Sequence, residues 1–169
     1  MTQIIDGKQI ADKIKHHIHK EILAINSGDR TQSAPFRPNL AIILVGERED
    51  SLLYVNLKEQ EAKKVGIDTH LYKCPTDIPE PEIFDMIRHL NEDEAVDGIL
   101  VQLPLPDGYD TDGIIRAIDP AKDADRFHPD NLQPLLQTCS LSGLMPPLFS
   151  VVFRIINEIS FDPAGKRAV

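Results

Sequence analysis

The apolar positions of this chain change period several times along its length, and these changes predict alternating helices and strands. From Ile10 to Ile25, isoleucines recur every three or four residues, which is the spacing of one helical stripe. Residues 40–45 (LAIILV) then form a continuous apolar run, typical of a parallel strand that is covered on both faces. The same reading predicts further helices over 50–64, 80–91, 111–118 and 148–159, and further strands over 68–74 and 99–101.

This order of elements predicts a three-layer α/β fold with a mainly parallel sheet and helices on both faces. Ligands of open parallel sheets bind at the carboxyl ends of the strands. The first predicted strand ends at Val45 and the third ends just before Gln102, so both chain exits lie at that edge. Residues 119–131 (DPAKDADRFHPDN) are predicted to form an irregular loop, stiffened by Pro120 and Pro129.

Composition narrows the possible functions. The 169 residues suffice for one domain with a real core, and the net charge of −9 argues against nucleic-acid binding. No apolar run approaches the roughly 18–20 residues of a membrane span, and residues 1–17 do not have the pattern of a signal peptide. Cys74 and Cys139 are isolated and lack metal-ligand spacing, so a cytoplasmic location is expected.

Two groups of polar side chains could carry chemistry at this edge. On the predicted helix 50–64, Ser51, Tyr54 and Lys58 fall within an arc of roughly 60°. They form either one face of a catalytic cleft or an ordinary exposed pair with a serine near the helix start. Gln102 is either an amide at the core edge bonded to backbone or a group that orients an amine or a water molecule.

A third group is the acidic loop, which holds Asp119, Asp123, Asp125 and Asp130. It lacks the sixth-position glycine and twelfth-position glutamate of an EF-hand, and no metal site is predicted. His128 stands alone and is expected to be structural. An aspartate of this loop could instead accept two hydrogen bonds from the edge of an amino-heterocycle.

Taken together, three segments resemble the bifunctional methylenetetrahydrofolate dehydrogenase/methenyltetrahydrofolate cyclohydrolase family, often called FolD. They are the S-x-x-Y-V-x-x-K pattern from Ser51 to Lys58, the string VDGILVQLPLP at 96–106, and residues 118–131 (IDPAKDADRFHPDN). The last segment matches the family pattern P-x-K-D-V-D-G-F-H-x-x-N. The resemblance runs over essentially the whole chain.

The resemblance implies an N-terminal α/β domain that holds the folate and a C-terminal Rossmann domain that holds NADP or NAD. For this chain it implies the catalytic domain over 1–147. Residues 148–169 would be a hinge helix and the start of the Rossmann domain, which is otherwise absent from these 169 residues. The implied reactions are oxidation of 5,10-methylenetetrahydrofolate and hydrolysis of the methenyl product to 10-formyltetrahydrofolate. A homodimer is implied for the two-domain protein.

The resemblance also implies roles for single residues. Lys58 would transfer protons in the hydrolysis, Gln102 would hydrogen-bond Lys58 and orient the attacking water, and Tyr54 would pack against the folate rings. Asp125 would bind the polar edge of the pterin. The residues implied to bind the substrate are Ser51, Tyr54, Gln102, Leu103, Pro104 and Asp125.

Three departures from the family pattern change these expectations. No G-x-G-x-x-G motif occurs, so no nicotinamide cofactor is expected to bind this chain alone. Residues 146–152 (PPLFSVV) replace the family's P-C-T-P-x-G-V, and an apolar patch is expected around the helix they begin. Arg126 and Gln133 replace family glycines, and Arg126 could pair with Asp125 or cover the pterin edge.

These departures keep two alternatives open beside the enzyme. One is a non-catalytic folate-binding or subunit-interaction module derived from the same domain. The other is the catalytic domain of a different two-domain dehydrogenase, against which the V-Q-L-P-L-P string argues.

Overall fold

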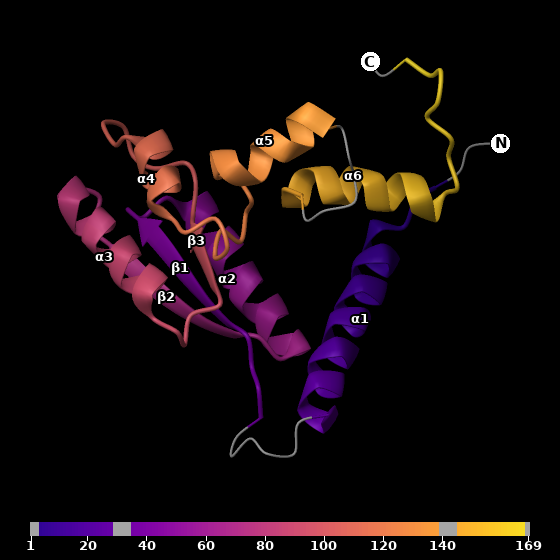
Figure 1. The fold of residues 1–169 in the computed structure, drawn as a ribbon, viewed down its shortest axis with the longest axis horizontal. Helices are drawn as coiled ribbons and strands as arrows, with labels where there is room; N and C mark the ends of the chain where they lie inside the picture. The colour runs from indigo at the N-terminus through magenta and orange to yellow at the C-terminus, as the bar shows by residue number, and fades with distance from the viewer. Residues whose placement is uncertain (1–3, 29–34, 139–144, 168–169) are drawn as a thin grey trace.

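A small parallel sheet forms the centre of the molecule. The computed structural model describes residues 4–28, 35–138 and 145–167. The strands β1 (Asn39–Val45), β2 (Asp68–Cys74) and β3 (Gly98–Val101) lie in the order β2-β1-β3, all parallel (Figure 1). The helices are α1 (Gly7–Gly28), α2 (Glu49–Val65), α3 (Glu80–Glu92), α4 (Thr111–Ala117), α5 (Pro129–Thr138) and α6 (Pro147–Glu158). The predicted α/β class with a parallel sheet is confirmed.

The central strand β1 is buried on both faces, which explains its continuous apolar run. Successive side chains of a strand point to opposite faces. Ala41, Ile43 and Val45 pack in the larger core, with apolar side chains of α3 and α4. Ile42 and Leu44 pack in the smaller core, with Val55 of α2. The sheet therefore has α2 on one face and α3 with α4 on the other.

Helix α5 corrects the prediction that the loop is irregular as far as residue 131. The helix begins at Pro129, and the backbone N–H groups of Asn131 and Leu132 donate to the His128 carbonyl oxygen at 2.9 and 3.1 Å. Proline is compatible with the first position of a helix, because its missing N–H would have no partner there. Pro129, which favoured a loop in the sequence, is thus the helix start.

Helices α1 and α6 form a more peripheral pair (Figure 1). Lys15 of α1 forms an ion pair with Glu61 of α2 at 2.8 Å, and Lys13 pairs with Glu158 of α6. Helix α6 has no fully buried residue, and its Leu148 and Phe149 side chains are 73% and 48% exposed. The expected apolar patch on this helix is present.

Within the described ranges, none of the helices combines the length and the apolar character that crossing a bilayer requires.

Candidate active site at the carboxyl edge of the sheet

Two candidate residues, Lys58 of α2 and Gln102 after β3, lie on facing sides of the helix and the sheet. Leu100 of β3 packs in the same small core as Val55 of α2. Gln102 lies two residues after Leu100, so it points to the same face of the sheet, toward α2. Lys58 lies three residues after Val55, so it follows Val55 on the same side of the helix. The two side chains are therefore directed toward each other.

The Lys58 amine and the Gln102 amide are in direct contact. Lys58 Nζ donates to Gln102 Oε1 at 3.1 Å, as the family resemblance implied. The other end of the amide, Nε2, donates to the Leu103 carbonyl oxygen at 2.7 Å, and the Gln102 backbone N–H donates to Ile43 at 2.8 Å. Gln102 is 9% exposed. Its oxygen is therefore held toward Lys58 by contacts at both the backbone and the side chain.

The chain leaves this site through an uncommon peptide bond. The bond between Leu103 and Pro104 is cis. Leu103 is half-buried and Pro104 is exposed. Of the two expected substrate-binding residues that follow Gln102 in this string, Leu103 contacts its amide directly, through the carbonyl oxygen that orients it.

Helix α2 presents its candidate residues at graded depths. Ser51 is buried at 3% exposure, Lys58 is half-buried, and Tyr54 is 59% exposed. Tyr54 lies one helical turn before Lys58, on the same side of the helix. Helix α2 therefore presents an exposed aromatic side chain one turn from a half-buried amine.

The Asp125 carboxylate lies within electrostatic reach of Lys58. Burial raises the pKa of Asp125, the Lys58 ammonium opposes that rise, and the nearby Asp123 charge adds to it. In the part of the chain that the structure describes, no hydrogen bond or ion pair engages this carboxylate. Asp125 is thus a half-buried acceptor that remains available to a ligand.

Lys122 anchors the loop that carries Asp125. Its ammonium donates to the carbonyl oxygens of Leu90, Asn91 and Asp93 at 3.0, 2.8 and 2.7 Å. These carbonyls lie at the C-terminal end of α3, where a cation is favoured. Lys122 therefore has a structural role.

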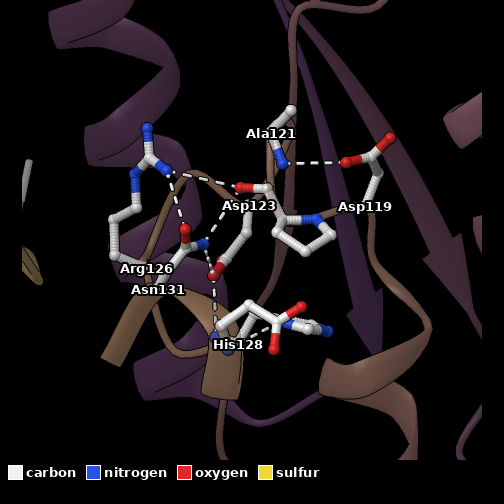
Figure 2. A network of polar contacts seen from close by, with 8 residues as sticks. Asp119, Ala121, Asp123, Arg126, His128 and Asn131 are labelled. Atoms are coloured by element: carbon white, nitrogen blue, oxygen red, sulfur yellow. Dashed lines mark hydrogen bonds and ion pairs between the residues drawn. The ribbon is translucent and has the colours of Figure 1, made fainter. Parts of the chain in front are cut away.

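Sequence reasoning missed the buried centre of the same loop, shown in Figure 2. Asp123 is 3% exposed, and its Oδ2 accepts hydrogen bonds from the His128 backbone N–H at 2.8 Å and from Asn131 Nδ2 at 2.9 Å. His128 is buried, and its Nδ1 accepts from the Asp130 backbone N–H at 3.1 Å, a structural contact as expected. The sequence showed a cluster of acids but not which of them is buried.

Arg126 takes a backbone conformation that favours glycine, with φ +59°. Its guanidinium donates to Asn131 Oδ1 at 3.1 Å and to the Pro120 carbonyl oxygen at 3.3 Å (Figure 2). Among the described residues it forms no ion pair with Asp125, so the first of the two effects expected for Arg126 does not occur. Gln133, the other residue at a family glycine, is exposed on α5.

The described residues do not fit a metal ion or a dinucleotide. Over these residues, no group of three or more His, Cys, Asp or Glu side chains could hold a metal. In the sequence, the two nearest glycines are Gly108 and Gly113, so no loop has the close glycine spacing that a pyrophosphate needs.

A cavity of about 620 Å³ lies elsewhere, between α1 and α6. Its lining includes Lys13 and Glu158, which neutralise each other, and shares no residue with the Lys58 site. The chemistry of the side chains, and not the size of a hollow, therefore marks the candidate site.

Comparisons with known proteins identify the family of this domain. The sequence model of the tetrahydrofolate dehydrogenase/cyclohydrolase catalytic domain matches residues 5–125. The bifunctional protein FolD of Geotalea uraniireducens (strain Rf4) is 41% identical over 175 residues, which cover 100% of this chain and 58% of that protein.

Solved structures give the same result. The 5,10-methylenetetrahydrofolate dehydrogenase of the silkworm Bombyx mori is 36% identical with a TM-score of 0.85, over 96% of this chain and 53% of that one. The methylenetetrahydrofolate dehydrogenase-cyclohydrolase (FolD) of Trypanosoma brucei, solved with NADP cofactor and inhibitor, is 30% identical with a TM-score of 0.89. That match covers 98% of this chain and 55% of that one.

The chain thus spans little more than half the length of the relatives it matches. The family model covers most of the chain and ends at Asp125, the residue that faces Lys58. On this match, the chain belongs to the tetrahydrofolate dehydrogenase/cyclohydrolase family, as its catalytic domain.

Proposed function

We propose that this chain binds a tetrahydrofolate derivative between α2 and the loop 119–126 and hydrolyses 5,10-methenyltetrahydrofolate to 10-formyltetrahydrofolate. The observation that carries the proposal is the 3.1 Å hydrogen bond from Lys58 Nζ to Gln102 Oε1. This contact orients the Lys58 amine at the carboxyl edge of the sheet, within electrostatic reach of Asp125, which forms no hydrogen bond or ion pair among the described residues.

The binding half of the proposal rests on Tyr54 and Asp125. A pterin has an edge of ring N–H and amino groups, and the Asp125 carboxylate can accept hydrogen bonds from both. The exposed Tyr54 ring offers a flat surface on which the folate rings can stack. We assign the remaining substrate contacts to Ser51, Leu103 and Pro104, as the family resemblance implies.

The hydrolysis needs a group that accepts a proton and then returns it. Water adds to the cationic methenyl carbon and loses a proton to the neutral Lys58 amine. Lys58 then gives that proton to the ring nitrogen as the carbon–nitrogen bond breaks, and the second proton of the water is released to solvent. One N–H of Lys58 donates a hydrogen bond to Gln102 Oε1. This bond fixes the directions of the lone pair and of the other N–H groups on the amine.

Oxidation of the methylene group belongs to our proposal for the whole protein. NAD(P)⁺, when bound, accepts the hydride from the methylene carbon. The described residues of this chain offer no glycine-rich loop for it, so the oxidation is not assigned to these residues. We place the end of the folate-binding domain near residue 147, where α6 begins.

The test is a spectroscopic assay of methenyltetrahydrofolate hydrolysis by this chain without nicotinamide cofactor. We expect Lys58→Ala to lower kcat by at least about 100-fold, the size of a general acid–base contribution, with the fold intact. Lys63→Ala on the same helix, an exposed lysine, is the matched control and should keep wild-type activity.

The assay also separates the alternatives. Hydrolysis that survives Lys58→Ala would remove Lys58 from the mechanism. Tight binding of the folate with no turnover by the wild-type chain would instead select a non-catalytic folate-binding module.

A further inference from the structure

Asp123 is a buried carboxylate that does not belong to the candidate active site. It is 3% exposed, and a buried carboxylate is stable only when hydrogen bonds satisfy it. Both of its bonds come from the start of α5, through the His128 backbone N–H at 2.8 Å and Asn131 Nδ2 at 2.9 Å. The carboxylate thus ties the loop to the helix that begins six residues later, at Pro129.

Asp125 lies between two fixed points of the same loop. On one side, the Ala124 backbone N–H donates to Ile99 of β3 at 3.1 Å. On the other side, the Arg126 guanidinium donates to Asn131 Oδ1 at 3.1 Å. Asn131 therefore contacts Asp123 through its nitrogen and Arg126 through its oxygen (Figure 2).

The Asp125 side chain has no hydrogen bond of its own within the described ranges, so the backbone alone sets its direction. We propose that Asp123 and Asn131 are positioning residues, which hold the turn 124–126 so that the Asp125 carboxylate stays half-buried and faces Lys58. Their effect on catalysis rests on the proposed function, whereas their effect on the turn does not.

The kinetic test uses Asp123→Asn and Asn131→Ala, with Asp119→Asn as the control in the same loop. Among the described residues, the Asp119 side chain accepts a hydrogen bond only from the local Ala121 backbone N–H, at 2.8 Å, and Asn can keep this contact. We expect KM for methenyltetrahydrofolate to rise about tenfold in both variants, with kcat per folded molecule within about twofold of wild type, because Lys58 and Gln102 lie on other elements. An unchanged KM in both variants would overturn the proposal, since it would show that the Asp125 carboxylate had not been displaced.

The second test does not depend on activity. The ¹³C carboxyl resonance of Asp125 is followed by NMR across acid pH in the wild type and in Asn131→Ala, which leaves the charge of the chain unchanged. Asn131 is partly exposed, so this variant is expected to fold. The Asp125 titration should move toward the value of an exposed aspartate in the variant and should not move in Asp119→Asn.

The two tests fail in different ways. A wild-type chain that neither binds nor hydrolyses the folate removes the proposed function, and the NMR titration then decides on positioning alone. An Asp125 titration that is the same in Asn131→Ala and in the wild type overturns the positioning role.

Discussion

Lys58 Nζ and Gln102 Oε1 are 3.1 Å apart although 44 residues separate them in the sequence. The contact joins a helix that follows the first strand to the residue that follows the third strand. Its partner contact, from Gln102 Nε2 to the Leu103 carbonyl oxygen at 2.7 Å, fixes which end of the amide faces the lysine. The geometry of the proposed proton transfer therefore depends on a neutral side chain.

The first prediction concerns that amide. Gln102→Ala should lower kcat for methenyltetrahydrofolate hydrolysis by about 10- to 100-fold, because the Lys58 amine loses the contact that orients it. The free energy of unfolding should fall by only about 1 kcal/mol, the usual net value of a hydrogen bond. Steady-state kinetics and urea denaturation measure the two effects. Gln133→Ala, at an exposed glutamine of α5, is the control, and equal activity of the two variants would contradict the role of Gln102.

Asp125→Asn should stabilise the chain at neutral pH while weakening folate binding. Burial raises the pKa of Asp125 above its ordinary value of 3.8, so the folded state holds its proton more tightly than the unfolded state. Stability therefore falls as pH rises through the window that begins near 3.8, and the neutral amide avoids this loss.

Thermal unfolding checks this prediction. The variant should have the higher Tm at pH 7, and the difference should vanish below pH 3.8, where both states of the wild type bind the proton. A variant with lower Tm than the wild type at pH 7 would show that the Asp125 carboxylate is stabilising, contrary to this account.

Arg126 offers a matched pair of substitutions. Both Arg126→Ala and Arg126→Gly remove the contacts to Asn131 and Pro120, but only glycine adopts the φ of +59° without strain. The glycine variant should therefore be more stable than the alanine variant by roughly 1 kcal/mol in urea denaturation. Equal stabilities would mean that the turn changes conformation once the guanidinium is gone.

Much of the fold was predictable because local signals and burial agree. The apolar run at 40–45 reflects a strand covered on both faces, and β2 occupies the predicted span 68–74. Helix α2 ends where Gly66 takes a left-handed conformation, with φ +94°. In these segments the sequence period and the tertiary environment require the same structure.

The loop 119–131 was less predictable because its order comes from distant partners. The carbonyl oxygens that hold Lys122 belong to the end of α3, and the strand that pairs with Asp123 is β3. Four aspartates in twelve residues look alike in a sequence, yet only one is fully buried. Pro129 is equally compatible with a loop and with the first position of a helix. The sequence alone therefore did not locate the beginning of α5.

A further prediction concerns the attachment of α1 to α2. Hydrogen bonds from Lys15 and then Lys64 lower the pKa of Glu61 to about 2. A depressed carboxyl pKa stabilises the folded state above the ordinary value of 4.5, and this contribution disappears as pH falls toward 2. Glu61→Gln should therefore speed amide hydrogen exchange in α1 at pH 7. A difference that persists at pH 2, or one that high salt leaves unchanged, would exclude the ion pair as its cause.

The two-residue period of β3 has a consequence for how this domain can change in length. Gln102 faces α2 because it shares its parity with Leu100, whereas Ile99 and Val101 pack in the core on the other face. Deleting or inserting one codon between Gly98 and Gln102 would carry the amide to the α3 side and bury it among isoleucines and valines. A change of two codons would keep its direction. Tolerance of insertions and deletions in this strand should therefore alternate between odd and even lengths. A library of such variants, assayed for methenyltetrahydrofolate hydrolysis, would display this pattern.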